Sequence, residues 1–371
     1  MIPLAKPLLG EREEQLVLDT LRSGRLALGP RLASFEASFA AAHGSTHVSA
    51  VSSGTAGLHL AIRAAGIQPG DDVVTTPFSF VASANCLLYE GARPVFCDID
   101  PVTLNITAET AGDALTENTS GILPVHIFGY PVDMPAMELL SRDCGLWIVE
   151  DACEALGAEH ADGTPVGARG NLSVFGFYPN KQITTGEGGM VVSPSAEVKE
   201  RIDSERNQGR APDMGWLDHD RLGFNYRLDD MSCALGLAQL ERLDELLAGR
   251  ARVAELYSEA LADVEGIGLP CPDEGGNRRS WFVYVVQLPP GVDRDDAVTA
   301  MRERGVDTKP YLPAIHLMSF YRERFGHKEG DFPVCEDVAA RSLALPFYPQ
   351  LTDGEVEQVV EALRDVIGQW G

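Results

Sequence analysis

The stretch FGFYPNKQITTGEGGMVV, residues 175–192, places one lysine, Lys181, between an aromatic run and a loop that holds Gly186, Gly188 and Gly189. The apolar residues that follow this loop predict a strand. A lone cation beside so much glycine suits two kinds of site, a phosphate cradle or a covalent amine catalyst. The two possibilities require different residues elsewhere in the chain.

Around this stretch, from about residue 47 to residue 192, short apolar runs alternate with segments of helical spacing. Helices are expected near 107–116, with Thr107 as cap, and near 133–144, with Asp133 as cap. Repeated strand-helix-strand units with nearly continuous apolar strands predict a mostly parallel sheet with helices on both faces.

A long helix is expected near 230–250, and the pattern changes after it. A strand at 281–288, a helix at 293–305 and a last helix near 353–368 predict an α+β arrangement. We therefore expect a large α/β domain with an N-terminal arm over residues 1–249 and a smaller C-terminal domain over residues 250–371.

The composition excludes several classes of partner. The formal net charge of −25 argues against nucleic acid and anionic membranes, because both are bound through an excess of Lys and Arg. Seven scattered cysteines without a CxxC pair make a metal site or a disulfide framework unexpected, and the N-terminus lacks a signal-peptide pattern. No run approaches the roughly 18 apolar residues of a membrane span. We expect a soluble, cytoplasmic protein.

Three features carry candidate chemistry. SSGTAG, residues 52–57, leads from a strand into a helix N-terminus, where free N–H groups favour an anion. In VEDACEALGA, residues 149–158, Asp151 ends an apolar strand and Glu154 follows three residues later. Lys181 is the third feature. Each has an ordinary structural alternative: a capped helix, an acid that caps a strand end, or a solvated lysine.

Taken together, the three features match what pyridoxal phosphate requires. A helix N-terminus binds the phosphate, Lys181 forms a Schiff base with the aldehyde, and Asp151 keeps the pyridine nitrogen protonated so that the ring accepts electrons. A P-loop would need GxxxxGK[ST], but Lys181 precedes its glycines and Gln182 occupies the Ser/Thr place. A dinucleotide fingerprint fails as well, because GEGG follows no nucleotide-type turn.

The chain resembles a known family over almost its whole length. GRLALGPRLASFE, SGTAG, TPFSFVASAN, EDACEALGA, FYPNKQITTGEGG, GFNYRLDDMSCALG and ALPFYPQLTDGEV, in this order, are similar to landmarks of the DegT/StrS-type nucleotide-sugar aminotransferases. The resemblance implies an α/β fold of the fold-type I, aspartate aminotransferase-like class, with pyridoxal 5'-phosphate as cofactor.

The resemblance also implies roles for individual residues. Lys181 carries the Schiff base and Asp151 contacts the pyridine nitrogen, while Phe80 stacks on the ring unless it belongs to the core. The positions implied at the phosphate are Gly54, Thr55, Ala56, Gly176 and, from the partner subunit, Asn225. The resemblance therefore implies a homodimer with shared active sites.

Two positions depart from the family pattern. Gly176 stands where many relatives have a serine that helps to hold the phosphate, so we expect that hydrogen bond to be lost or replaced by water or backbone. Glu154 stands where other members have His or Gln beside the cofactor. This acid, with TTGEGG after the lysine, is similar to the perosamine-synthase branch, which aminates C4 of a 4-keto-6-deoxy sugar.

The predicted reaction transfers an amino group from an amino acid, L-glutamate by resemblance, to a keto sugar nucleotide. Candidate substrate contacts lie in a segment that resembles the family's small-domain loop, although a structural role is equally open for each: Lys309, Tyr311, His316 and Tyr321. An aminotransferase for a cyclitol or other ketone remains open, as does a regulatory protein without turnover. The dehydratase branch is disfavoured, because it carries His in place of the lysine.

Overall fold

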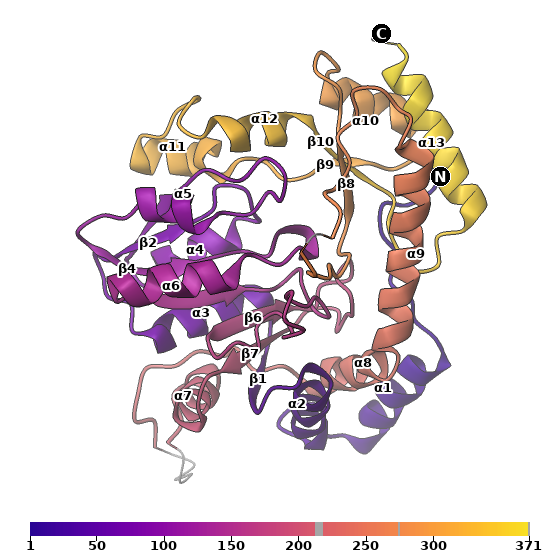
Figure 1. The fold of residues 1–371 in the computed structure, drawn as a ribbon. Helices are drawn as coiled ribbons and strands as arrows, with labels where there is room; N and C mark the ends of the chain where they lie inside the picture. The colour runs from indigo at the N-terminus through magenta and orange to yellow at the C-terminus, as the bar shows by residue number, and fades with distance from the viewer. Residues whose placement is uncertain (212–217, 274, 370–371) are drawn as a thin grey trace.

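A seven-stranded sheet forms the centre of the molecule in the computed structural model, which describes residues 1–211, 218–273 and 275–369. Its strands are β1 (His47–Val51), β2 (Asp72–Thr75), β3 (Arg93–Phe96), β4 (Thr119–Leu123), β5 (Trp147–Asp151), β6 (Leu172–Gly176) and β7 (Gly189–Ser193). The order is β1-β7-β6-β5-β4-β2-β3 (Figure 1). Five strands from β6 to β3 run parallel, and β7 is antiparallel to both of its neighbours. The predicted fold class is confirmed.

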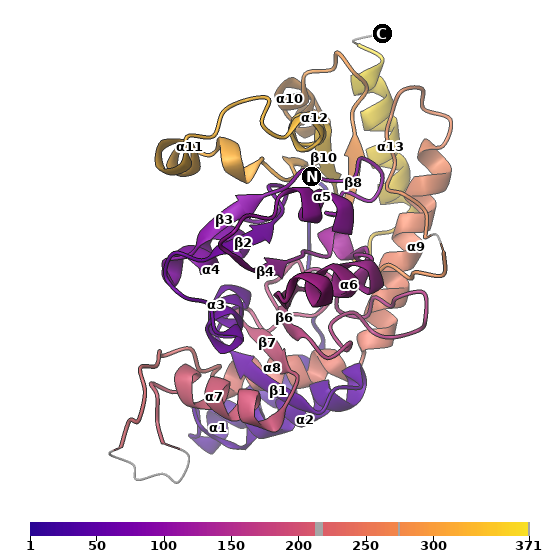
Figure 2. The same ribbon diagram turned by 60° about the vertical axis from the view of Figure 1, so that its left-hand side comes forward.

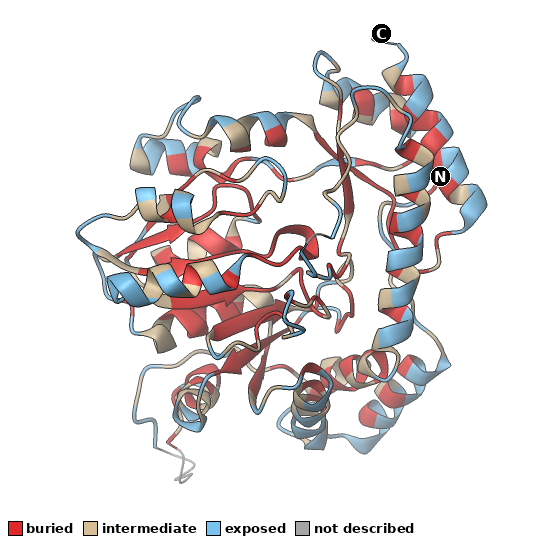
Figure 3. Ribbon diagram, viewed as in Figure 1, coloured by how far each residue is buried: buried red, intermediate tan, exposed pale blue. Residues whose placement is uncertain are grey.

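Helices cover both faces of this sheet. In Figure 2, α3 (Gly54–Ala65) and α6 (Met134–Cys144) lie on opposite sides of the strands. α4 (Ala82–Tyr89) packs beside α3, and α5 (Ala108–Asp113) packs beside α6. The strands between the two helical layers are buried along most of their length (Figure 3), as expected for a parallel sheet.

Two expected helix caps are confirmed. The side chain of Thr107 accepts a hydrogen bond from the N–H of Thr110 at the start of α5. The side chain of Asp133 accepts one from the N–H of Ala136 at the start of α6. These caps satisfy N–H groups that have no partner inside the helix.

The long helix expected near 230–250 is wrong, because the chain forms α8 (Asp230–Leu240) and α9 (Leu243–Leu261). Arg242 interrupts the helical path with φ −125° and ψ 23°. α8 packs against the N-terminal helices α1 (Glu11–Ser23) and α2 (Pro30–His43), whereas α9 turns away along the molecule (Figure 1). The expected single helix is divided into α8 and α9 because the two segments pack against different neighbours.

A second core surrounds a three-stranded antiparallel sheet in the order β8-β10-β9. Its strands are β8 (Tyr284–Gln287), β9 (Lys309–Pro310) and β10 (Ser342–Leu345). The helices of the chain that have not yet been named are α7 (Ala196–Arg206), α10 (Arg294–Glu303), α11 (Ser319–Phe325), α12 (Pro333–Arg341) and α13 (Asp353–Ile367). Two short 3-10 turns are η1 (Ile127–Gly129) and η2 (Ile315–Leu317).

α9 continues across the predicted domain boundary between residues 249 and 250, and that boundary stays a prediction. No helix in the described part of the chain is long and apolar enough to cross a membrane.

Glycines allow the start of α3 to approach strands β6 and β7. A Cβ atom on Gly189 would lie 2.8 Å from the carbonyl oxygens of both Phe175 and Ser53. A Cβ on Gly57 would lie 2.7 Å from Val174 Cγ1. Both separations are shorter than real carbon contacts, so these two positions fix how close the helix lies to the sheet.

We expect Gly189→Ala to lower the free energy of unfolding by about 1–3 kcal/mol, because the added methyl group meets backbone on two sides. Gly112→Ala in α5 is the control, since its Cβ would have Leu140 Cδ1 as nearest neighbour at 3.7 Å. The urea-unfolding midpoint of each variant measures the effect. Equal midpoints for Gly189→Ala and the wild type would contradict the close approach.

Candidate active site

Three predicted features meet at one edge of the central sheet. β1 is antiparallel to β7 and β7 is antiparallel to β6, so β1, β5 and β6 all run in the same direction. Their carboxyl ends lead respectively into the start of α3, into residues after Asp151, and into the loop that carries Lys181. This is the edge at which ligands bind in open α/β sheets.

Lys181 lies in a partly enclosed setting, with a side chain that is 15% exposed. Its Nζ atom lies 3.5 Å from Oε1 of Glu154 and 3.7 Å from the ring centroid of Phe282. The aromatic face attracts the ammonium group. Phe282 was not predicted, because it lies about a hundred residues away and no local pattern connects the two.

The backbone of the lysine loop is held by the buried guanidinium of Arg250 on α9. Its Nη2 donates to the carbonyl oxygens of Lys181 at 2.6 Å and Asn180 at 3.1 Å, and its Nη1 donates to that of Phe282 at 2.9 Å. Burial lowers the pKa of Arg250 to about 10. One side chain therefore fixes the main chain on both sides of the Lys181 Cα atom.

Asp151, the last residue of β5, is buried and held on both carboxylate oxygens. Ser83 Oγ donates to Oδ2 at 2.7 Å, and the N–H of Cys153 donates to Oδ1 at 3.1 Å. Charges on Asp151 and Lys181 both act on the thiol of Cys153, so the acid and the amine lie close to the same residue. Ser83 was not predicted, because it lies 68 residues before Asp151 in the sequence and no local pattern connects the two.

The start of α3 offers free donors. Ser53 Oγ accepts the N–H of Ala56 at 3.0 Å, whereas no described residue accepts from the N–H of Gly54 or Thr55. A Cβ on Gly54 would lie 2.9 Å from Cys153 Sγ and 3.5 Å from Gly176 Cα. The helix N-terminus is thus open to an anion and closely packed underneath.

Gly176 lies beside Cys153 rather than beside open space. A Cβ at position 176 would lie 3.3 Å from Cys153 Cβ and 3.4 Å from its Sγ. A side chain at position 176 would therefore be in tight contact with Cys153, which would have to move by a few tenths of an ångström.

Phe80 is 63% exposed, so its ring does not belong to the core. Its carbonyl oxygen accepts the N–H of Ser83 at 3.2 Å at the start of α4. Ser83 in turn holds Asp151, which ties the segment of the exposed ring to the acid at the end of β5.

Asn225 lies on an extended segment that runs past the end of β1. The N–H of Ser52 donates to the carbonyl of Tyr226 at 2.8 Å, and the rings of Phe224 and Tyr226 stack with centroids 5.0 Å apart. His59 of α3 packs on both rings and bonds to the Tyr226 hydroxyl at 3.2 Å. Asn225, between the stacked residues, is exposed.

The four candidate substrate contacts fall into two groups. Lys309 is exposed on β9. The ring centroid of Tyr311 lies 5.8 Å from that of Phe128, and the charge of Glu154 adds to burial in raising the pKa of Tyr311. His316 and Tyr321 are fully buried. His316 Nε2 bonds to Glu336 Oε1 at 3.0 Å, and the hydroxyl of Tyr321 donates to an oxygen of Asn85 at 2.7 Å. The structure thus gives the second group internal partners.

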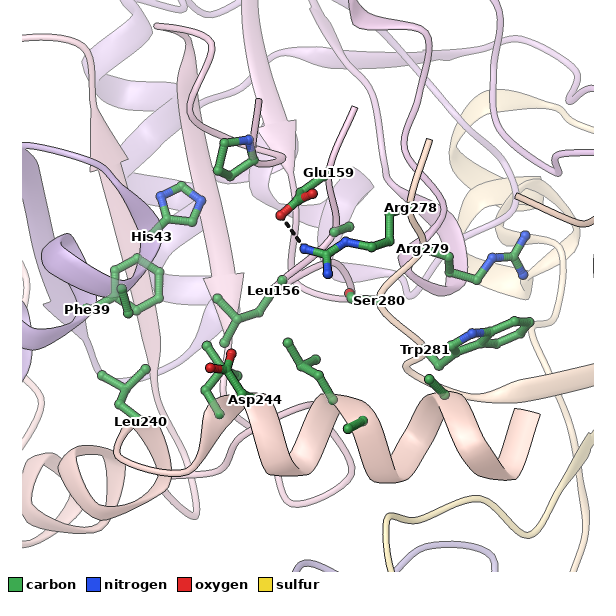
Figure 4. Close-up of a pocket in the computed structure, with 18 of the residues that line it drawn as sticks. Phe39, His43, Leu156, Glu159, Leu240, Asp244, Arg278, Arg279, Ser280 and Trp281 are labelled. Carbon is green, nitrogen blue, oxygen red and sulfur yellow. Dashed lines mark hydrogen bonds and ion pairs between the residues drawn. The ribbon is translucent and has the colours of Figure 1, made fainter. Parts of the chain in front are cut away.

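A cavity of about 490 Å³ lies away from Lys181, between α2, the α8–α9 junction and residues 278–281 (Figure 4). Phe39, Leu156 and Trp281 contribute apolar walls, and an ion pair joins Glu159 to Arg278. The residues that line this cavity do not include Lys181, Asp151 or Gly54.

Comparison with known proteins identifies the family. Residues 7–364 match the DegT/DnrJ/EryC1/StrS aminotransferase family. The spore coat polysaccharide biosynthesis protein SpsC of Bacillus subtilis is 36% identical over 379 residues, covering 99% of this chain and 97% of SpsC. The crystal structure of the aminotransferase TlmJ from Streptoalloteichus hindustanus has a TM-score of 0.92 and 35% identity, covering 100% of this chain and 99% of TlmJ.

A second solved structure agrees. The sugar aminotransferase CalS13 from Micromonospora echinospora has a TM-score of 0.90 and 30% identity, covering 98% of this chain and 100% of CalS13. The predicted transaminase activity and the predicted cofactor are confirmed. Because the match spans nearly the entire sequence, the chain belongs to the DegT/DnrJ/EryC1/StrS family of pyridoxal-phosphate-dependent aminotransferases.

Proposed function

We propose that this enzyme transfers an amino group from an amino acid, L-glutamate by resemblance, to a sugar ketone carried on a nucleotide. The observation that carries the proposal is the meeting of a partly buried amine, a buried acid and unpaired helix N–H groups at one sheet edge. The relatives named for polysaccharide biosynthesis and as a sugar aminotransferase support a sugar substrate.

The residues at this edge fit pyridoxal phosphate. The free N–H groups of Gly54 and Thr55 suit its phosphate, Asp151 suits its protonated ring nitrogen, and the exposed ring of Phe80 suits its flat face. Lys181 would hold it covalently through its amine. When bound, the cofactor supplies an aldehyde that takes up the amino group and a ring that accepts electrons.

Lys181 then acts twice through the same atom. Its Nζ would take the proton from the donor Cα and deliver it to the cofactor carbon that receives the amino group. In the second half-reaction it would carry a proton from that carbon to the acceptor carbon that becomes aminated. Arg250 keeps the lysine backbone fixed during both transfers, because its hydrogen bonds go to main-chain oxygens. Ser83 keeps the carboxylate of Asp151 in the position from which it would meet the ring nitrogen.

The proposed acceptor is a 4-keto-6-deoxyhexose nucleotide aminated at C4, supported by Glu154 and TTGEGG. Lys309 and Tyr311 are the proposed substrate contacts, since Lys309 is exposed and Tyr311 shares the surroundings of Glu154. A panel of nucleotide ketosugars and a cyclitol ketone, tested for glutamate-dependent amination, distinguishes this acceptor from the alternative one. A regulatory protein without turnover would keep its yellow colour when L-glutamate is added. A cytoplasmic location remains a prediction.

The proposed active unit is a homodimer with shared sites. Asn225 is exposed and lies between two residues whose rings pack toward α3 of their own chain. Alternation along an extended segment directs its amide away from α3 and toward a neighbouring subunit. There it would donate to the phosphate held by that subunit's helix N-terminus.

Lys181→Ala should abolish transamination and leave the fold intact, because the amine proposed to move the proton is removed. The absorbance band of lysine-bound cofactor should be lost, while size-exclusion elution stays unchanged. Turnover near the wild-type rate would overturn the proposed function.

Asp151→Asn should slow the glutamate half-reaction by about 10- to 100-fold, since a charge-assisted hydrogen bond is replaced by a neutral one. Stopped-flow absorbance in a single turnover measures this rate. Cofactor should stay bound through Lys181, which provides an internal control. An unchanged rate would show that Asp151 is not the partner of the ring nitrogen.

Mixing Lys181→Ala chains with Asn225→Asp chains tests the shared site. If Asn225 crosses to the partner, each mixed dimer has one site with both lesions and one site with neither, so activity should return in proportion to the mixed dimers. Differently tagged wild-type chains establish the conditions for subunit exchange. If exchange occurs and activity does not return, the contact lies within one chain.

A further inference from the structure

Glu154 presents one carboxylate oxygen to Lys181 and has the other already occupied. Its Oε2 accepts the N–H of Phe128 at 2.9 Å, and its Oε1 lies 3.5 Å from Lys181 Nζ. The carboxylate is buried, and its own carbonyl oxygen accepts a hydrogen bond from Gln182 at 2.5 Å. The side chain is therefore fixed, with a single oxygen free to face the amine.

The N–H group that fixes Glu154 comes from a strained turn. Phe128 adopts φ 52° and ψ 25°, a left-handed conformation that is uncommon for an aromatic residue. Gly129 follows with φ 82°, and a Cβ there would lie 1.8 Å from the carbonyl oxygen of Ser280. Surrounding backbone thus holds the turn in place, as is typical of strain retained at functional sites.

We propose that Glu154 is the charge partner of Lys181, and that its free oxygen stabilises the ammonium group that forms each time the lysine accepts a proton. The assignment rests on the proposed role of Lys181 as the proton carrier. In each half-reaction the proton would pass through Lys181 Nζ, from the donor Cα to the cofactor in the first and from the cofactor to the acceptor carbon in the second, so Glu154 itself gains and loses none. It is a positioning residue that makes the lysine a stronger base.

The groups that face Glu154 agree with this role. Burial raises the pKa of Glu154, while the charge of Lys181 and the Phe128 N–H oppose the rise and the charge of Asp151 adds to it. Tyr311 and Cys153 are the other titratable groups nearby, and burial raises the pKa of each well above its usual range, so both stay neutral. The charge of Lys181 and the Phe128 N–H are therefore the two neighbours that favour the ionised form of Glu154 against the effect of burial.

By the family resemblance, the charge separates this chain from members with His or Gln at the same position. A neutral Gln can accept the Phe128 N–H with its carbonyl oxygen but cannot neutralise an ammonium group. Glu154→Gln thus keeps the structural hydrogen bond and removes only the charge. Glu150→Gln is the matched control, because Glu150 is also buried but bonds to His126 at 3.1 Å and Asn171 at 3.0 Å.

The first measurement is the rate at which apo-protein captures pyridoxal phosphate at different pH values. Capture needs the neutral amine, and without the carboxylate the lysine loses its proton more easily. The midpoint of the pH profile should therefore move down by about one pH unit in Glu154→Gln and stay in place in Glu150→Gln. Glu154→His, which also removes the negative charge, should move it in the same direction.

The second measurement is a single turnover with L-glutamate deuterated at Cα. Proton abstraction should slow by about 10- to 100-fold in Glu154→Gln, with a larger isotope effect than in the wild type. If midpoint and rate both match the wild type, Glu154 only accepts the Phe128 N–H and the proposal is wrong. Activity in Lys181→Ala would instead overturn the proposed function, so the two failures are distinguishable.

Discussion

The buried guanidinium of Arg250 is the interaction on which the arrangement of the site depends. It donates to three backbone carbonyls, two in the lysine loop and one just before β8, so one side chain on α9 connects the central sheet to the second core. A buried cation is costly to desolvate, and its hydrogen bonds must offset that cost. The position of the lysine is consequently tied to the packing of α9.

Much of the fold follows from local sequence. Thr107 and Asp133 precede helices as capping residues, and the apolar strands follow one another at the spacing of β-α-β units. The site could be predicted in outline for the same reason. SSGTAG, Asp151 and Lys181 each lie at or after the carboxyl end of a strand, and the carboxyl ends of strands that run in one direction meet at one edge. Site residues at the ends of strands can thus be predicted from the sequence.

The rest depends on contacts that a local pattern does not contain. The apolar spacing through residue 242 continues unbroken, yet Arg242 leaves the helix and bonds to Glu245, while α8 and α9 pack against different partners. Phe282 meets Lys181 only because the second core brings the start of β8 to the lysine loop. Glu154 was predicted near the cofactor by resemblance. Its contacts with the amine of Lys181 and with the N–H of Phe128 could be found only from the structure.

The pairing of β1 with β7 has a consequence for how the chain folds. The register joins His47 to Ser193, so the sheet edge next to the helix N-terminus closes only after nearly 150 residues of intervening chain are in place. Such non-local pairing is slow, because loop-closure entropy is lost before the contacts form. During synthesis β1 emerges early and waits without its neighbour. An interrupted or slowly folding chain therefore exposes a bare strand edge that is free to pair with other chains.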